Sequence, residues 1–189
     1  MLIYTIGHST RTLEEFQKLL QQYRIEMLLD VRTVPSSRHV PHFNAESLRR
    51  SLERRGVEYY HFKGLGGLRR PAKDSRNAGW RNSSFRGFAD YMQTAEFQKA
   101  LAQMMELAST KRAALMCAEA VPWRCHRSLI ADALLSLHHA EVRHIISETS
   151  VQNHELTPFA VVEEGRLTYP EADATGRLRL NFFQKYPRN

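Results

Sequence analysis

"LIYTIGHSTRTLEEFQKLLQQYRIEMLLDVR" (residues 2–32) decides the fold class. The stretch begins and ends with mostly apolar runs, at 2–7 and 25–32. Between them, the apolar residues of 12–24 recur at the spacing of one helix face. Strands that are apolar on both faces are typical of parallel sheets covered by helices. The stretch therefore predicts a strand, a helix and a second strand parallel to the first.

The same alternation continues along the chain. The remaining predicted strands are 57–62, 112–119 and 141–147. The remaining predicted helices are 44–55, 85–109 with a break near Thr94, and 127–139. With right-handed crossovers, this order predicts a single α/β domain with an open, mainly parallel sheet of about five strands and helices on both faces. We expect that domain over residues 1–150, including a basic loop at 63–86, and a hairpin-like C-terminal extension and tail over 151–189.

Composition limits the class of protein. The chain has 189 residues, which suits one domain, and it contains no run of 18 apolar residues that would predict a membrane span. The N-terminus lacks the basic start and long apolar core of a signal peptide. We therefore expect a cytoplasmic protein without a membrane partner. In that compartment the two cysteines are expected to be free, catalytic or metal-bound rather than joined in a structural disulfide.

Positive charge is concentrated in one segment. The formal net charge is +7, and residues 63–86 hold seven basic residues against the single acid Asp74. A basic segment of this kind favours an anionic partner, such as a nucleotide or nucleic acid. A solvated loop without a partner is the alternative, because basic loops are common.

Polar and reactive residues follow four of the predicted strands. Ligands of doubly wound sheets bind at the carboxyl ends of the strands, so these residues are the candidate site. They are Gly7, His8 and Ser9 after the first strand; Asp30, Arg32, Ser37 and Arg38 after the second; Gly66 and Gly67 after the third; and Cys117, Glu119, Cys125, His126 and Arg127 after the fourth.

Seven short strings carry a family resemblance. In chain order they are "TIGHST", "DVR", "PSSR", "PHFN", "GLGG", "CAE" and "CHR". The chain resembles the family called domain of unknown function 488, roughly from Ile3 to Ser147. The resemblance implies an α/β protein whose biochemical role is not settled. It also implies that the strand-end residues, together with Pro35, form the site that the family shares.

We expect an enzyme that acts on a phosphate-bearing ligand at this edge, although the residues leave open whether the protein is an enzyme. Arg32, Arg38 and Arg127 offer guanidinium groups that match phosphate geometry. The candidate catalytic groups are His8, Asp30, Glu119 and Cys125. The other expected substrate contacts are Gly7, Ser9, Ser37, Gly66, Gly67 and His126.

Two alternatives concern the cysteines. Cys125 lies at a predicted helix start beside His126 and Arg127, which favours a lowered thiol pKa and redox or nucleophilic chemistry. Cys117, Cys125 and His126 can also serve as soft ligands for zinc or iron, although their spacing is not that of a zinc finger. A structural role for Cys117, as a small buried side chain, competes with these alternatives. For the phosphate site, the competing interpretation is that Arg32 pairs with Asp30 or Glu119 in a structural network.

A further alternative is a nucleic-acid-binding module without catalysis. Trp80 stands among the basic residues of the loop and is a candidate ligand contact, whereas Phe88 is expected to pack inward. The tail Arg179–Phe183, "RLNFF", resembles in degenerate form the peptide by which bacterial DNA-processing proteins bind the sliding clamp. Packing of the same apolar residues on this protein's own core is the competing interpretation.

Overall fold

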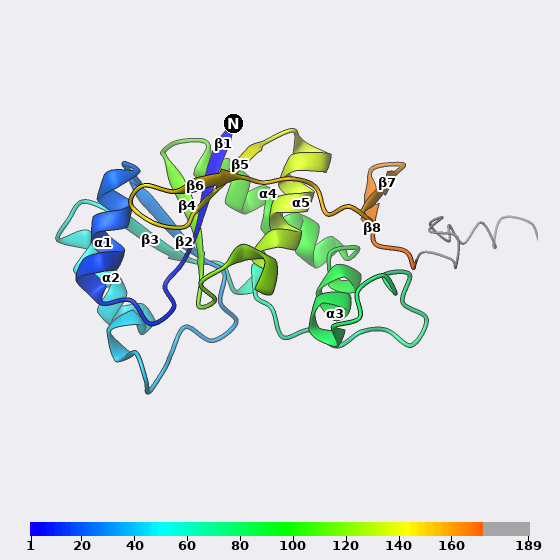
Figure 1. Ribbon diagram of the computed structural model, residues 1–189, viewed down its shortest axis with the longest axis horizontal. Coiled ribbons are helices and arrows are strands. Elements are labelled where there is room, and N and C mark those ends of the chain that lie inside the picture. The colour runs from blue at the N-terminus through cyan, green and yellow to red at the C-terminus, as the bar shows by residue number, and fades with distance from the viewer. Residues whose placement is uncertain (172–189) are drawn as a thin grey trace, which may run out of the picture.

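The structure is a computed structural model and describes residues 1–171 (Figure 1). The predicted clamp-binding segment Arg179–Phe183 lies outside the described residues. The strands are β1 (Leu2–Gly7), β2 (Met27–Asp30), β3 (Glu58–His61), β4 (Ala113–Cys117), β5 (Glu141–Ile145), β6 (Val151–Asn153), β7 (Val161–Glu163) and β8 (Arg166–Thr168). The α-helices are α1 (Leu13–Gln22), α2 (Ala45–Glu53), α3 (Ser83–Tyr91), α4 (Ala95–Ala108) and α5 (Arg127–His138).

The main sheet has six strands in the order β3-β2-β4-β1-β5-β6. The first five are parallel to one another, and β6 pairs antiparallel with β5 at the edge. The predicted α/β class and mainly parallel sheet are confirmed, and the sixth strand is an addition to the expected five. β6 was not predicted, because its three residues are all exposed and form no apolar run. β7 and β8 form a separate two-stranded hairpin.

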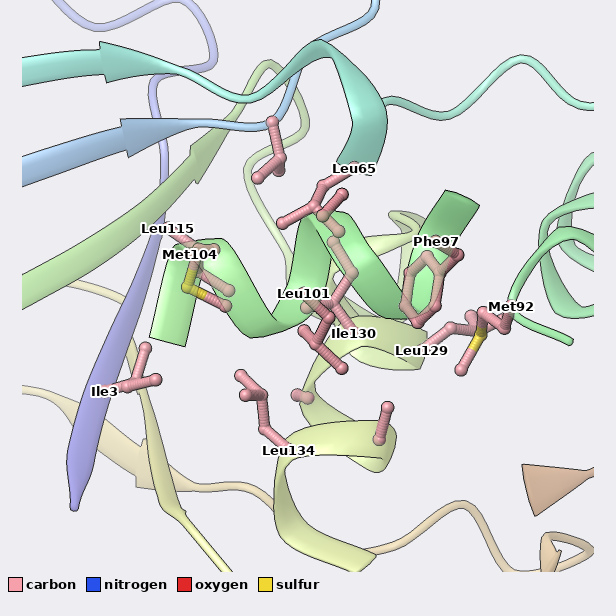
Figure 2. Close-up of a cluster of buried hydrophobic side chains, with 14 of the residues drawn as sticks. Ile3, Leu65, Met92, Phe97, Leu101, Met104, Leu115, Leu129, Ile130 and Leu134 are labelled. Carbon is pink, nitrogen blue, oxygen red and sulfur yellow. The ribbon is translucent and has the colours of Figure 1, made fainter. Parts of the chain in front are cut away.

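Helices cover both faces of the sheet (Figure 1). On one face, α1 and α2 contribute Phe16, Leu20, Leu48 and Leu52 to a core with the strands. The other face carries α4 and α5, whose apolar side chains form a larger cluster with Ile3 and Leu115 of the sheet (Figure 2). Because both faces of the sheet centre are buried, the central strands β1, β2 and β4 are mostly apolar, whereas β3 and β5 carry charged and polar residues.

The order of the strands determines what meets at their carboxyl ends. Gly7 is in register with Cys117, and Asp30 is in register with His61 of β3. The last residues of four neighbouring strands therefore lie side by side at one edge. Three short 3-10 helices shape the described segments beyond it: η1 (Pro41–Phe43) after β2, η2 (Lys63–Leu65) after β3 and η3 (Pro122–Arg124) between β4 and α5.

Candidate functional site

The expected site residues gather at this edge, but the structure divides them into two groups. His8, Ser9, Arg32, Ser37 and Glu119 line a hollow of about 480 Å³ that is shared by the ends of β1, β2 and β4. The second group, the cysteine cluster, is made of the buried Cys117, Cys125 and Arg127 and the half-buried His126, with Gly67 against His126. Arg38 is exposed, and Gly66 is buried against Thr33.

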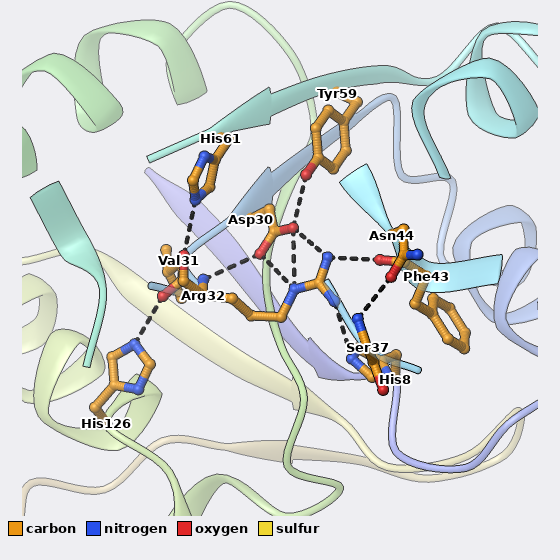
Figure 3. Close-up of polar contacts among 10 residues, drawn as sticks. All are labelled: His8, Asp30, Val31, Arg32, Ser37, Phe43, Asn44, Tyr59, His61 and His126. Carbon is orange, nitrogen blue, oxygen red and sulfur yellow. Dashed lines mark hydrogen bonds and ion pairs between the residues drawn. The ribbon is translucent and has the colours of Figure 1, made fainter. Parts of the chain in front are cut away.

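A buried ion pair forms the floor of the hollow (Figure 3). Arg32 donates from Nε and Nη2 to the two carboxylate oxygens of Asp30, at 2.9 and 2.5 Å, and its backbone N–H bonds the same carboxylate at 3.0 Å. Tyr59 donates its hydroxyl to Asp30 Oδ2 at 2.7 Å, and Arg32 Nη2 also reaches the carbonyl of Phe43. Asp30 is fully buried and Arg32 is 6% exposed. Both side chains are thus occupied by protein partners, which reduces their availability for a phosphate or a substrate proton.

His8 lies beside this pair and is held in one tautomer. Its Nδ1 donates to the carbonyl of Ser9 at 2.8 Å, so Nε2 presents a lone pair to Arg32 Nη1 at 3.3 Å. The ring stacks on Phe43 with centroids 4.3 Å apart. Burial, with the adjacent Arg32 charge, lowers the pKa of His8 to about 4, although the Ser9 carbonyl acts in the opposite direction. His8 is therefore neutral near pH 7 and already uses both ring nitrogens.

The remaining lining of the hollow is polar and more exposed. The hydroxyl oxygen of Ser37 accepts hydrogen bonds from the backbone N–H groups of His39 and Val40, at 3.2 and 3.3 Å. Glu119 is exposed, and its carboxylate makes no ion pair with any described residue. Gly7, which precedes His8, has no room for a side chain, because a Cβ there would lie 1.8 Å from the carbonyl oxygen of Glu119.

The second group places three soft ligand atoms together. The sulfurs of Cys117 and Cys125 and a ring nitrogen of His126 all lie within 4.8 Å of one another. Cys117 ends β4, and the turn through η3 folds the chain back so that Cys125 and His126 meet it just before α5. Both cysteines are free and buried, at 7% and 3% exposure.

The orientation of His126 is fixed by the end of β2. Its Nε2–H donates to the carbonyl of Val31 at 3.0 Å (Figure 3), and Phe88 packs on the ring at 4.9 Å. Nδ1 is left facing the sulfur of Cys125 at 3.7 Å. There it can share a proton with the thiol or give its lone pair to a metal. The missing side chain of Gly67 leaves space at the same nitrogen, since a Cβ would lie 3.0 Å from Nδ1.

Arg127 is buried beside these sulfurs and is 1% exposed. It donates from Nε to Cys125 Sγ at 3.4 Å, from Nη2 to the carbonyl of Glu119 at 2.6 Å, and from Nη1 to Thr5 Oγ1 at 3.5 Å. No carboxylate among the described residues forms an ion pair with this guanidinium. Since a buried cation requires a partner of opposite charge, the thiolate of Cys125 is the group placed to provide it.

The two thiols respond to this environment in opposite directions. Burial alone would raise the pKa of Cys125, but hydrogen bonds to Cys117 and His126, with the charges of His126 and Arg127, outweigh it and place that pKa well below its usual value. The hydrogen bond from Cys117 to Cys125, together with burial, raises the pKa of the Cys117 thiol. Cys125 is therefore the thiolate of the pair, and Cys117 keeps its proton in metal-free protein.

A line of buried polar residues continues from Arg127 into the protein. Thr5 Oγ1 lies 2.7 Å from His144 Nδ1, and His144 Nε2 lies 3.0 Å from His154 Nδ1. His154 Nε2 in turn lies 3.0 Å from Asp132 Oδ1. Burial, with the nearby charges of His154 and Arg127, lowers the pKa of His144 to about 3. With His144 neutral and its Nδ1 accepting from Thr5, the donors in the line point from Arg127 toward the Asp132 carboxylate.

These four residues were not expected as part of the site. They come from β1, β5, the segment after β6, and α5, so their proximity depends on packing between distant parts of the chain. One signal was present: three of them are polar residues inside predicted apolar strands or on a predicted helix. A polar side chain at such a position is buried only with hydrogen-bond partners.

The basic segment 63–86 runs along the surface from η2 to α3. Lys63, Arg70, Lys73, Arg76 and Arg81 are exposed. Arg69 instead lies over the ring of Tyr91, 3.5 Å from its centroid. Phe88 is fully buried, which confirms its predicted inward packing, while Trp80 is half-buried.

Comparison with protein-family models identifies a match to the domain of unknown function DUF488 over residues 12–134. The chain belongs to this family. The matched DUF488 segment contains β2, β4 and most of α5, and so includes Asp30, Arg32 and the cysteine cluster. No curated protein and no solved structure matches the chain. Among the described residues, the helices of this DUF488 protein do not combine the length and apolar character that a bilayer crossing requires.

Proposed function

We propose that this protein is an intracellular metal-dependent enzyme that binds one zinc or iron(II) ion through Cys117, Cys125 and His126. The observation that carries the proposal is the grouping of three soft ligand atoms within 4.8 Å, with the ring of His126 oriented by a backbone carbonyl. Zinc and iron favour thiolate and imidazole ligands. A metal-binding histidine almost always donates its other N–H to a carbonyl or carboxylate, as His126 does to Val31.

The dimensions of the cluster suit such an ion. A tetrahedral zinc with its usual bond lengths separates a sulfur from a nitrogen ligand by roughly 3.5 Å. The distance between Cys125 Sγ and His126 Nδ1 is 3.7 Å. Gly67 leaves the space beside Nδ1 free of a side chain, and the Arg127 N–H would hydrogen-bond a metal-bound thiolate.

Three protein ligands leave a fourth position, which is the pattern of catalytic rather than structural zinc sites. In that position the ion would supply an activated water or polarise a substrate oxygen. Glu119 has an exposed carboxylate without an ion-pair partner among the described residues, and its backbone carbonyl accepts a hydrogen bond from Arg127. We assign it the role of exchanging protons with the substrate. Phosphate groups would be bound by Arg38 and the exposed residues of 63–86, because Arg32 and Arg127 are engaged within the protein.

The decisive measurement is metal content by elemental mass spectrometry, on reduced protein never exposed to chelator. We expect about one zinc or iron per chain, lost in Cys125→Ser and His126→Gln. His61→Gln is the matched control, because His61 also bonds a backbone carbonyl, that of Arg32, yet lies outside the cluster. Metal-free wild-type protein that also fails to take up added zinc or cobalt(II) would reject the proposal.

A thiol redox function is the second candidate, and the contact between Arg127 and Cys125 favours it. A low-pKa cysteine with a second cysteine in reach is typical of redox sensors, in which the first is oxidised and the second resolves it. Mass spectrometry of protein treated with hydrogen peroxide separates the two candidates. A Cys117–Cys125 disulfide that forms in metal-free wild-type protein and is reversed by thiols would support the redox function.

A further inference from the structure

Both tryptophans of the chain line the same hollow, although they are far apart in sequence. The chain has two tryptophans, Trp80 before α3 and Trp123 on η3. Together they border a hollow of about 620 Å³, which lies outside the cysteine cluster and the hollow at His8. A volume of this size is in the range of small-molecule sites, which span roughly 300–1,000 Å³.

The two rings differ in how they are held. Trp80 packs against Phe85, Phe159 and Tyr169, with centroid distances of 4.8, 4.9 and 5.5 Å, so it forms a fixed wall. Its indole N–H is buried and has no hydrogen-bond partner among the described residues. Trp123 is 59% exposed, which is unusual for the largest apolar side chain. An exposed aromatic ring at the rim of a hollow is suited to stack on a planar ligand.

The polar lining suits the edge of a heterocycle. Gln152 and Asn153 belong to the edge strand β6, and neither side chain is hydrogen-bonded to another described residue. Side-chain amides pair with the donor and acceptor pattern of nucleobases. Glu155 also lines the hollow, and its carboxylate can accept hydrogen bonds from base amino groups or ribose hydroxyls.

Each tryptophan is followed by an exposed arginine, in "GWRN" and "PWRC". Neither Arg81 nor Arg124 forms an ion pair with a described residue. Aromatic rings alternating with free guanidinium groups are the usual arrangement for binding single-stranded nucleic acids, in which bases stack and phosphates pair with arginine.

We propose that this hollow binds a nucleotide unit, with the base stacked on Trp123 and its edge at Gln152 and Asn153. Arg81 and Arg124, which follow the two tryptophans in the chain, are the proposed phosphate contacts. The site is separate from the proposed metal centre and does not depend on it. The same chemistry is found in a free mononucleotide and in one unit of a single strand.

Binding is measured by the anisotropy of a fluorescently labelled oligothymidylate of about 12 nucleotides, at low salt. We expect Trp123→Ala to weaken binding roughly 5- to 150-fold, the range given by one stacked base. Trp123→Phe keeps an aromatic ring and should restore most of the affinity. Because Trp123 is exposed, both variants should keep the wild-type circular dichroism spectrum. In wild-type protein, intrinsic fluorescence reports on the hollow directly, since both tryptophans line it.

Competition by unlabelled thymidine monophosphate separates the two sources of the ligand. Displacement at concentrations close to those of the oligonucleotide assigns the site to free nucleotides, and weak displacement assigns it to a single strand. Two results would overturn the proposal. One is the absence of binding by either probe at low salt. The other is binding that is unchanged in Trp123→Ala but lost in Arg69→Ala/Arg70→Ala, which would place the contact on the basic segment instead.

Discussion

Arg127 donates its Nε–H to Cys125 Sγ at 3.4 Å, and this sulfur provides the nearest compensating charge for a guanidinium that is 1% exposed. The next anionic group along its hydrogen bonds is Asp132, reached only through Thr5, His144 and His154. This arrangement makes the charge of Cys125 part of the folded structure. It also connects the two cysteine hypotheses, because metal ligation and thiol redox chemistry both require the thiolate.

Substituting Arg127 should change the pKa of the Cys125 thiol more than substituting an exposed arginine nearby. In metal-free protein we expect Arg127→Met to raise the pKa of Cys125, because the thiolate loses the buried cation that donates to it. The thiolate absorbance in the ultraviolet, followed against pH, measures this shift. Arg124→Met is the control, because Arg124 is exposed. An unchanged titration in Arg127→Met would show that Arg127 does not stabilise the thiolate.

The pair formed by Asp30 and Arg32 should act as a structural unit. Asp30→Asn leaves a buried guanidinium without its anion, so we expect a loss of about 3–5 kcal/mol in the free energy of unfolding. Tyr59→Phe removes one hydrogen bond to the same carboxylate and should cost about 1 kcal/mol. Urea unfolding measures both. Near-wild-type stability of Asp30→Asn, with lost activity, would instead indicate a catalytic carboxylate.

Acid should destabilise the protein through its buried histidines. The pKa of His8 falls from 6.5 to about 4 in the folded state. Between these values the unfolded chain binds a proton that the folded chain does not, so stability decreases as pH falls from about 6.5 to about 4. The contribution of His8, roughly 3 kcal/mol, is fully present above that window. His144, with a pKa near 3, should extend the loss to lower pH.

Urea unfolding at a series of pH values checks this dependence. His8→Gln should show a flatter profile between about pH 4 and 6.5 than the wild type, because glutamine does not titrate there. Parallel profiles for the two proteins would mean that His8 is protonated as readily in the folded state as in the unfolded chain.

How much of this could be predicted from sequence depends on the distance between the residues involved. The five parallel strands were predictable because the central ones form apolar runs and helices alternate with all five. The meeting of Gly7, Asp30 and Cys117 followed from the parallel order alone. The pairing of Asp30 with Arg32 was one of several options, since sequence does not show whether an arginine points toward its neighbour or into a pocket. The line of hydrogen bonds from Arg127 to Asp132 could not be predicted from sequence, because it joins four segments that are distant in the chain.

The grouping of the cysteine cluster also could not be predicted from sequence, although its residues are close together in the chain. Seven residues separate Cys117 from Cys125, a spacing that does not match a zinc finger. The turn through η3 brings the two sulfurs together, and the carbonyl of Val31 orients His126. Neither the turn nor the carbonyl leaves a residue pattern in the sequence. The soft ligands could therefore be identified from sequence, while their grouping required the fold.

Two glycines offer a test that separates metal binding from stability. A Cβ on Gly67 would lie 3.0 Å from His126 Nδ1, the nitrogen proposed as a metal ligand. Gly67 does not have a positive φ, so Gly67→Ala should cost little backbone strain. We expect this variant to lose most of its metal while its midpoint of urea unfolding changes little.

Gly56 is the matched control: its φ is +72° and a Cβ there would meet nothing within 4 Å. Gly56→Ala should therefore destabilise the fold by roughly 1–2 kcal/mol and keep its metal. Full metal content in Gly67→Ala would argue against an ion at Nδ1 and favour the thiol redox function.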